Sequence, residues 1–274
     1  MSRYRAWLGG AVLLLVLVWL IVYPLGLVAL ESVRVDGKWT VAFYERFLDR
    51  PNEWRALWGS LWISIVTVLL AGAIGIPLAW LMSRFDFPGR RVLSVLVALP
   101  VVLPPLVGVI SFLFLFGESG FLARAIIKVA GLTEPPWRLQ GAGAILLVHA
   151  YSMYVYFYLF TRAGLASLDP SLLEAASALG AGRGRTLRRV VLPLLRPSLA
   201  GAAVLTFMTS LASFSAPYIF GGGFRVMTTQ IVSTRLNGDT TMAMVETMSL
   251  TMVALLGLWL LRRTEGRESI AVSR

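Results

Sequence analysis

The amino-acid sequence predicts an all-α membrane protein with six transmembrane helices and both termini in the cytoplasm. Hydrophobic residues make up 57% of the 274-residue chain. They gather into six runs that reach or approach the roughly 20 residues a helix needs to cross the hydrocarbon core. Lysine and arginine collect between alternate runs, as expected for loops that stay on the cytoplasmic side.

The six apolar runs define the order of the predicted spans. The first follows Arg3 and Arg5 and resembles a signal peptide, but it is too long for one and no small-residue cleavage site follows, so we expect a retained span. The third contains Pro100, Pro104 and Pro105, which should bend it where protein or a cavity satisfies the freed carbonyls. The predicted spans are about 7–30, 57–81, 92–116, 141–160, 198–220 and 241–261.

The distribution of basic residues predicts the orientation. The inside segments carry 15 lysines and arginines and the outside loops carry 10, and acidic residues show the opposite bias. The predicted inside segments are 1–6, 82–91, 161–197 and 262–274, and the outside loops are about 31–56, 117–140 and 221–240. We predict one domain over 1–274, with a core of about 55–262 preceded by the extra span at about 7–30.

The first outside loop is rich in aromatic residues. Its apolar side chains favour a short amphipathic helix near the outer surface, where aromatic rings anchor at the headgroup level. A solvated loop is the alternative. The residues concerned are Trp39, Phe43, Tyr44, Phe47, Leu48 and Trp54.

Composition argues against several other functions. The chain has no cysteine, which excludes disulfides and thiolate metal sites. Its net charge of +11 does not indicate nucleic-acid binding, because the basic residues are confined to short segments between spans. The glycine-rich run 180–185 lacks the Lys-Ser/Thr pair of a nucleotide-binding loop. We expect no catalytic residue, no metal site and no cofactor bound by this chain.

The polar segment 169–197 interrupts the apolar runs and reads as two short helices. Asp169 can cap the first, Pro170 suits its first position, and Gly180 supplies its stop. A second helical run follows, and we expect Pro193 and Pro197 to break or kink the chain before the fifth span. The apolar faces contain Leu172, Ala175, Ala176 and Leu179 in the first run, and Leu187, Val190, Val191 and Leu194 in the second.

The spacing within this segment resembles a known signature. Glu174-Ala175-Ala176, three residues, Gly180, nine residues, and Val190-Val191-Leu192-Pro193 match the EAA pattern, with valine in place of the usual isoleucine. That pattern marks the MetI-like membrane subunits of binding-protein-dependent ABC importers. The resemblance covers about residues 55–262 as a hydropathy pattern. Within the family, the segment 210–223 resembles that of permeases for ferric iron, polyamine and phosphonate uptake.

The resemblance implies a function and partners. It implies that loop 161–197 forms cytoplasmic coupling helices that dock on a separate ATPase, which binds the ATP. The implied partners are two ATPase subunits, a second permease, identical or related, an extracytoplasmic solute-binding protein and the lipid bilayer of a bacterial inner membrane. The coupling residues would be Glu174, Ala175, Ala176, Leu179, Gly180 and Pro193. An interfacial linker with basic residues facing lipid phosphates is the alternative for this loop.

Polar residues inside the spans are candidates for the translocation pathway. His149 is the only histidine and lies near Tyr151, Tyr154 and Tyr158 in the fourth span. Glu246 is the one acidic residue inside a predicted span. Such residues usually face the bundle interior, so a pathway role and a structural hydrogen bond both remain open.

The end of the fifth span is the other pathway candidate. Ser213 and Ser215 precede Pro217, and Gly221 to Gly223 follow. We expect Pro217 to open the helix and the two serines to line a passage, whereas simple packing of small residues is the alternative. A secondary transporter or channel subunit is the alternative function, disfavoured by the few intramembrane ionisable residues and the lack of a visible repeat.

Overall fold

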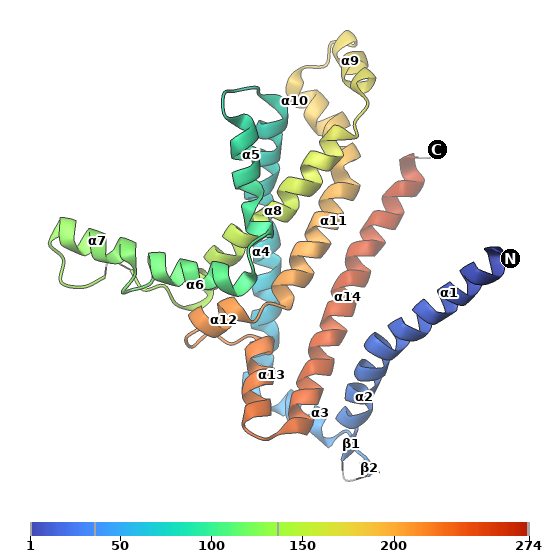
Figure 1. Ribbon diagram of the computed structural model, residues 1–274, viewed down its shortest axis with the longest axis vertical. Coiled ribbons are helices and arrows are strands. Elements are labelled where there is room, and N and C mark those ends of the chain that lie inside the picture. Colours follow the sequence, from blue (N-terminus) through green and yellow to red (C-terminus); the bar gives the residue numbers. More distant parts are fainter. Residues whose placement is uncertain (1, 36, 136, 273–274) are drawn as a thin grey trace. The chain divides into compact units, whose positions relative to one another are not determined.

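The computed structural model describes residues 2–35, 37–135 and 137–272, and most of them are helical. The chain forms two compact units, and Figure 1 labels their elements. The first unit comprises Met1–Leu57 and Val226–Val253. The second comprises Trp58–Arg225 and Ala254–Arg274. Each unit is described by itself.

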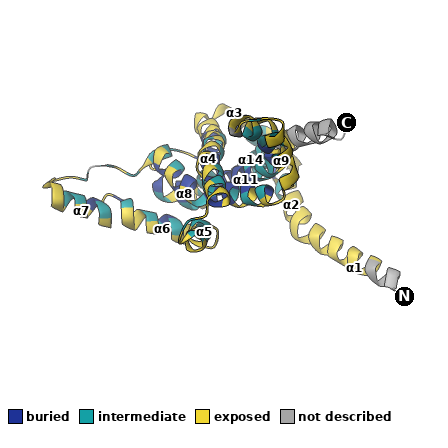
Figure 2. Ribbon diagram, turned by 90° about the horizontal axis from the view of Figure 1, so that it is seen from above, coloured by how far each residue is buried: buried dark blue, intermediate teal, exposed yellow. Residues whose placement is uncertain are grey.

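The first unit contains the N-terminal helices and the polar segments around them. The side chains described in α1 are exposed along its length (Figure 2), as expected of a helix covered by lipid. A hairpin of two short strands pairs Arg34 with Trp39, which the sequence did not predict. The elements are α1 (Ser2–Leu17), a π turn (Val18–Val22), α2 (Tyr23–Ser32), β1 (Arg34–Val35), β2 (Lys38–Trp39), α3 (Ala42–Asp49), α13 (Met227–Leu236) and the first parts of α4 (Pro51–Arg84) and α14 (Thr240–Val272).

The core of the first unit confirms the amphipathic helix predicted in the first outside loop. Phe47 of α3 is buried and packs in one cluster with Ala56 of α4, Met227 of α13 and Met242 of α14. Glu45, on the same helix, remains exposed. The helix therefore forms because one face covers this cluster and the other meets water.

The second unit is built around α8, the helix with the most buried residues of this unit. Helix α8 runs beside α11 (Figure 1). Glycines allow α8 to approach two neighbouring helices closely. A Cβ on Gly164 of α8 would lie 2.7 Å from Leu195 of α11, and a Cβ on Gly75 of α4 would lie 2.7 Å from Phe157 of α8. The elements are most of α4, α5 (Arg90–Ala98), a 3₁₀ turn (Leu99–Val101), α6 (Pro105–Phe116), α7 (Phe121–Ala130), α8 (Gly141–Ala166), α9 (Pro170–Ala178), α10 (Arg183–Thr186), a π turn (Leu187–Val191), α11 (Leu192–Leu211), α12 (Ser215–Phe220) and the last part of α14.

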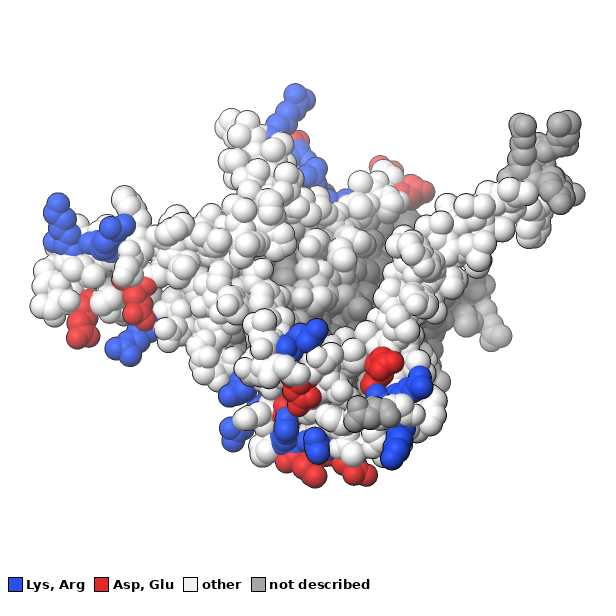
Figure 3. All heavy atoms as spheres, turned by 60° about the horizontal axis from the view of Figure 1, so that its bottom comes forward, with Lys and Arg blue, Asp and Glu red and all other residues white. Residues whose placement is uncertain are grey.

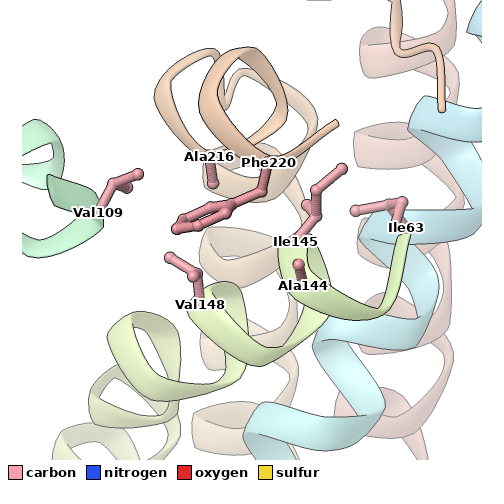
Figure 4. Close-up of a cluster of buried hydrophobic side chains, with 7 residues drawn as sticks. All are labelled: Ile63, Val109, Ala144, Ile145, Val148, Ala216 and Phe220. Carbon is pink, nitrogen blue, oxygen red and sulfur yellow. The ribbon is translucent and has the colours of Figure 1, made fainter. Parts of the chain in front are cut away.

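An apolar cluster holds the short helix α12 against α8. The Phe220 ring lies at its centre, with Val109 of α6 on one side and Ile145 of α8 on the other (Figure 4). Phe220 is 1% exposed and Ile145 is fully buried. Burying a phenylalanine side chain is worth about 1.5–3 kcal/mol, so Phe220 alone can anchor a helix of one and a half turns.

Six helices are long and apolar enough to cross a membrane, as predicted. The described residues give these candidates as Trp7–Ser32, Pro51–Arg84, Pro105–Ala130, Gly141–Ala166, Gly184–Leu211 and Thr240–Leu260. Figure 3 shows that on one face the charged side chains gather in groups, with uncharged surface between the groups.

The third span differs from its prediction. We predicted a bent helix over about 92–116, but the helix ends after Val101 and a new one begins at Pro105. Pro104 is extended, with ψ of 133°, and Pro105 starts α6, where its missing N–H costs nothing. The three prolines therefore break the span rather than bend it. The apolar length continues instead through α7, a helix we had assigned to the outside loop 117–140.

The fifth span begins and ends earlier than predicted. Pro193 and Pro197 do not break the chain, because a helix continues from Arg183 to Leu211. The π turn at Leu187–Val191 lies directly before Pro193, and the Leu192 N–H donates to Leu187 O. The regular α-helical hydrogen bonds are therefore already shifted where the proline lacks an N–H. The break lies instead at 212–214, upstream of Pro217, which is buried within α12.

Candidate coupling loop and pathway residues

The loop between α8 and the fifth long helix begins with a well-capped helix. The Asp169 side chain accepts a hydrogen bond from the Ser171 backbone N–H at 2.9 Å, and Pro170 follows at the first helical position. The hydrogen bond from the Ser171 backbone holds the pKa of the Asp169 carboxyl below its ordinary value. This confirms the predicted start of α9.

The end of α9 is equally well defined. Gly180 has a φ of 72°, in the left-handed region, and its N–H donates to Ser177 O at 2.9 Å. The N–H of Ala181 donates to Ala176 O at 3.0 Å, so the two bonds close the helix end as a Schellman motif. No atom lies within 4 Å of a Cβ placed on Gly180. The backbone angle, and not a lack of space within the chain, is therefore what favours glycine at this position.

Much of the apolar side of α9 is exposed in the described part of the chain. Leu172 is 44% exposed and Leu179 is 87% exposed, although α9 lies in a polar loop. Glu174 and Ala175 are also exposed, and Ala176 is half-buried. The first part of the EAA-like motif, from Glu174 to Gly180, is thus largely accessible. The half-buried Pro193 instead belongs to the long helix that continues toward α11.

His149 forms the centre of a buried polar cluster. It is 1% exposed, and its ring nitrogens lie 3.2 Å from the Thr67 hydroxyl, 3.1 Å from the Ser210 hydroxyl and 3.0 Å from the Ser213 hydroxyl. These contacts tie α4, α8 and the end of α11 together. The packing interpretation of His149 is therefore supported, and each hydroxyl can donate to or accept from the ring according to its tautomer.

A small cavity adjoins this cluster where the third and fifth spans are broken. Its volume is about 50 Å³, and Ser213, Ser215, Pro104 and Tyr151 are among its lining residues. That space suits a few water molecules rather than a solute. Two pathway candidates do not line it: Pro217 is buried nearby in α12, and the Tyr154 hydroxyl donates to Val97 O at 2.8 Å. The structure thus brings the two serines and His149 together, and leaves Pro217 and Tyr154 outside.

Glu246 belongs to a separate polar network in the first unit. It is fully buried and accepts a hydrogen bond from the Thr234 hydroxyl at 2.7 Å. Glu53 of α4 is a neighbouring buried carboxylate, and it accepts a hydrogen bond from the Gln230 amide at 3.2 Å. The sequence placed Glu53 in an outside loop, so its position beside Glu246 was not predicted. Glu53 lies 177 residues from its hydrogen-bond donor Gln230, and no local sequence pattern could reveal that contact.

These polar sites all lie on or between long apolar helices. Among the described residues, no group of three or more histidine, cysteine, aspartate or glutamate side chains could hold a metal ion. The distinctive features are long apolar helices interrupted near polar residues and one exposed, capped helix between the fourth and fifth of them. They define a multi-span membrane protein with an exposed, capped helix in one of its loops.

Comparison with known proteins identifies the family. Residues 73–263 match the family described as binding-protein-dependent transport system inner membrane component. The chain belongs to this family and is a multi-pass protein of the inner membrane.

Curated relatives are similar over most of this chain. It is 29% identical over 237 residues to a probable ABC transporter permease protein, y4fN, of Sinorhizobium fredii, which covers 85% of this chain and 41% of the relative. It is 30% identical over 226 residues to a ferric transport system permease of Actinobacillus pleuropneumoniae, covering 81% and 32%. The Escherichia coli molybdenum transport permease ModB is 37% identical over 172 residues, covering 61% and 72%. The chain thus spans only about a third to two fifths of the length of the first two relatives.

Solved structures share the fold. A bacterial ABC transporter involved in the import of the acidic polysaccharide alginate matches with a TM-score of 0.80 at 20% identity, over 97% of both chains. The MetNI methionine ABC transporter, in an inward-facing conformation, matches with a TM-score of 0.60 at 18% identity, over 80% of this chain and 95% of that one. These similarities extend to the fold alone.

Proposed function

We propose that this chain is the pathway-forming permease subunit of an ATP-driven importer, coupled to separate ATPase subunits through α9. The exposed α9 surface is the observation that supports this most directly. Leu172 and Leu179 present apolar area in a loop that the charge pattern places in the cytoplasm. A rigidly capped helix with such a face suits docking into a groove on another protein.

The remaining partners follow from the family to which the chain belongs. A second permease, identical or related, would complete the pathway, two ATPases would drive it, and an extracytoplasmic protein would deliver solute. One structural relative is described in complex with an alginate pentasaccharide-bound periplasmic protein, which is the kind of partner we propose here. ATP would bind to the partner ATPase and not to this chain.

The mechanism we propose is alternating access. Closure of the ATPases would move α9 and, through the continuous helix from Arg183 to Leu211, shift the break at 212–214 where the His149 cluster lies. A continuous helix transmits displacement because its hydrogen bonds resist bending. The glutamate pair Glu53 and Glu246 and the serines Ser213 and Ser215 are the polar groups we propose to test as pathway residues, together with Pro217 and Tyr154.

The experiment that tests this function is reconstituted transport. The chain, purified with any co-purifying ATPase and permease, is placed in proteoliposomes with the binding protein and solute. Uptake should require ATP and the binding protein. Uptake driven by an ion gradient without ATP would instead support a secondary transporter.

Ferric iron is the solute we propose to test first, because two similar relatives are named as ferric transport permeases. Polyamine and phosphonate remain the other candidates from the sequence, and molybdate is added by the similarity to ModB. Competition among these solutes for binding-protein-dependent uptake would decide between them.

A further inference from the structure

A groove with a basic mouth and an apolar wall lies between α5 and the end of α8, within the second unit. Its volume is about 990 Å³, at the upper end of the 300–1,000 Å³ common for small-molecule sites. Its charged lining residues are Asp86, Arg90, Arg91 and Arg162. Asp86, in the connection before α5, forms an ion pair with Arg90 at the start of α5, so the excess positive charge comes from Arg91 and Arg162.

Contacts with Tyr158 fix the position of one of these arginines. An Arg162 Nη1 hydrogen donates to the Tyr158 hydroxyl at 2.9 Å, and the guanidinium lies 5.4 Å from the centre of the same ring. Because a guanidinium has five N–H donors, most of them remain for an acidic ligand. Arg91 is exposed in the first turn of α5, on the same groove.

The wall of the groove below the arginines is apolar. Val95, Leu99 and Val102 line it from α5 and the turn that follows, and Leu159 lines it from α8. The nine residues of α5 rise about 13 Å. That length is close to half of the ~30 Å hydrocarbon core, or one leaflet. Both arginines lie at the cytoplasmic ends of their helices in the orientation that the charge pattern predicts.

We propose that this groove binds an anionic phospholipid of the cytoplasmic leaflet, with its phosphate on Arg91 and Arg162 and an acyl chain along the apolar wall. Basic pockets between helices on the cytoplasmic side are suited to acidic lipid headgroups. A free oxyanion could contact the arginines but would leave the wall uncovered. A basic mouth next to an apolar wall about as long as one leaflet therefore favours a lipid over a free oxyanion.

Native mass spectrometry of the full chain in detergent, titrated with phosphatidylglycerol, tests the proposal. Each arginine near a membrane surface is worth about a fivefold change in affinity for acidic lipid, so Arg91→Gln with Arg162→Gln should weaken binding about 30-fold. Arg91→Lys with Arg162→Lys keeps the charge and should stay within a few-fold of the wild type. Arg124→Gln with Lys128→Gln removes two charges from α7 and should change nothing. If the double glutamine variant does not fold, Arg91→Gln alone should still show the fivefold loss.

Three results would overturn the proposal. Equal binding of phosphatidylcholine would show that the arginines do not select the ligand. Displacement of phosphatidylglycerol by inorganic phosphate at equal concentration would show that the groove takes a free oxyanion. Unchanged lipid binding in the glutamine variants, with loss of pairing to a second permease, would show that the groove is a subunit interface.

Discussion

The backbone angle of Gly180 determines whether α9 can end in its present turn. Its φ of 72° costs other residues about 1–2 kcal/mol, and β-branched residues are the least tolerated there. Gly180→Val should therefore insert in the membrane normally but lose at least tenfold in ATPase pull-down and in ATPase stimulation by loaded binding protein. Gly180→Asn, which tolerates this angle, is the matched control and should retain most of both activities. Equal behaviour of the two variants would remove the turn from the coupling mechanism.

Asp169 gives the same loop a pH dependence. Its pKa is lowered in the folded protein by the Ser171 backbone hydrogen bond, so the capping contribution is complete above the ordinary aspartate pKa and is lost as the pH falls through the lowered value. Hydrogen exchange of α9, corrected for intrinsic rates, should accelerate only in that acid range. Asp169→Asn, whose amide oxygen accepts at every pH, should abolish the dependence. An unchanged profile in Asp169→Asn would assign the effect to another group.

The bond between Thr234 and Glu246 should be measurable as a coupling energy. Glu246→Leu leaves the Thr234 hydroxyl buried without a partner, which costs about 1–3 kcal/mol. Glu246→Gln keeps an acceptor and should be milder. Thr234→Val with Glu246→Leu should destabilise less than the sum of the single changes, because no polar group is then stranded. Thermal unfolding in detergent gives the four values, and strict additivity would show that the bond contributes nothing.

At the scale of elements, apolar length predicted helices well and their interruptions poorly. The spans were foreseen because twenty apolar residues have few other stable arrangements. The break at 212–214 was placed at Pro217 instead, since no proline or glycine marks it. It depends on Phe220 packing against α8, a contact between distant segments. The helix α13 was missed for a similar reason, because its polar sequence is stabilised by the buried Met227 cluster.

The break between α11 and α12 also gives a labelling prediction. Ser215 lines the small cavity and is half-buried, whereas Ala202 on α11 is fully buried. In this cysteine-free chain, Ser215→Cys should react with a water-soluble thiol reagent in at least one nucleotide state, at least tenfold faster than Ala202→Cys. If both cysteines stay unreactive in every state, Ser215 is a packing residue.

For the whole molecule, the sequence predicted the local structure of the 169–180 segment better than the polar networks. Asp169, Pro170 and Gly180 predicted where this helix begins and ends, because capping and a left-handed glycine are local properties. The partners of His149 and Glu53 could not be predicted in this way. Thr67 lies 82 residues from His149 and Glu53 lies 177 residues from Gln230, so only the packed bundle brings these side chains together.

The orientation of the whole chain is the remaining prediction. The excess of basic residues on one set of loops places Phe85, Arg185 and the segment after Arg262 inside, and Gly37, Thr133 and Gly223 outside. Single cysteines are introduced at Phe85, Arg185, Thr133 and Gly223. In intact spheroplasts, an impermeant thiol reagent should label the cysteines at Thr133 and Gly223 at least tenfold more than those at Phe85 and Arg185. Detergent permeabilisation is the control and should expose all four. Labelling of Arg185→Cys from outside would put α9 on the side without ATP, and both the docking role of Leu179 and the proposed lipid site would then be untenable.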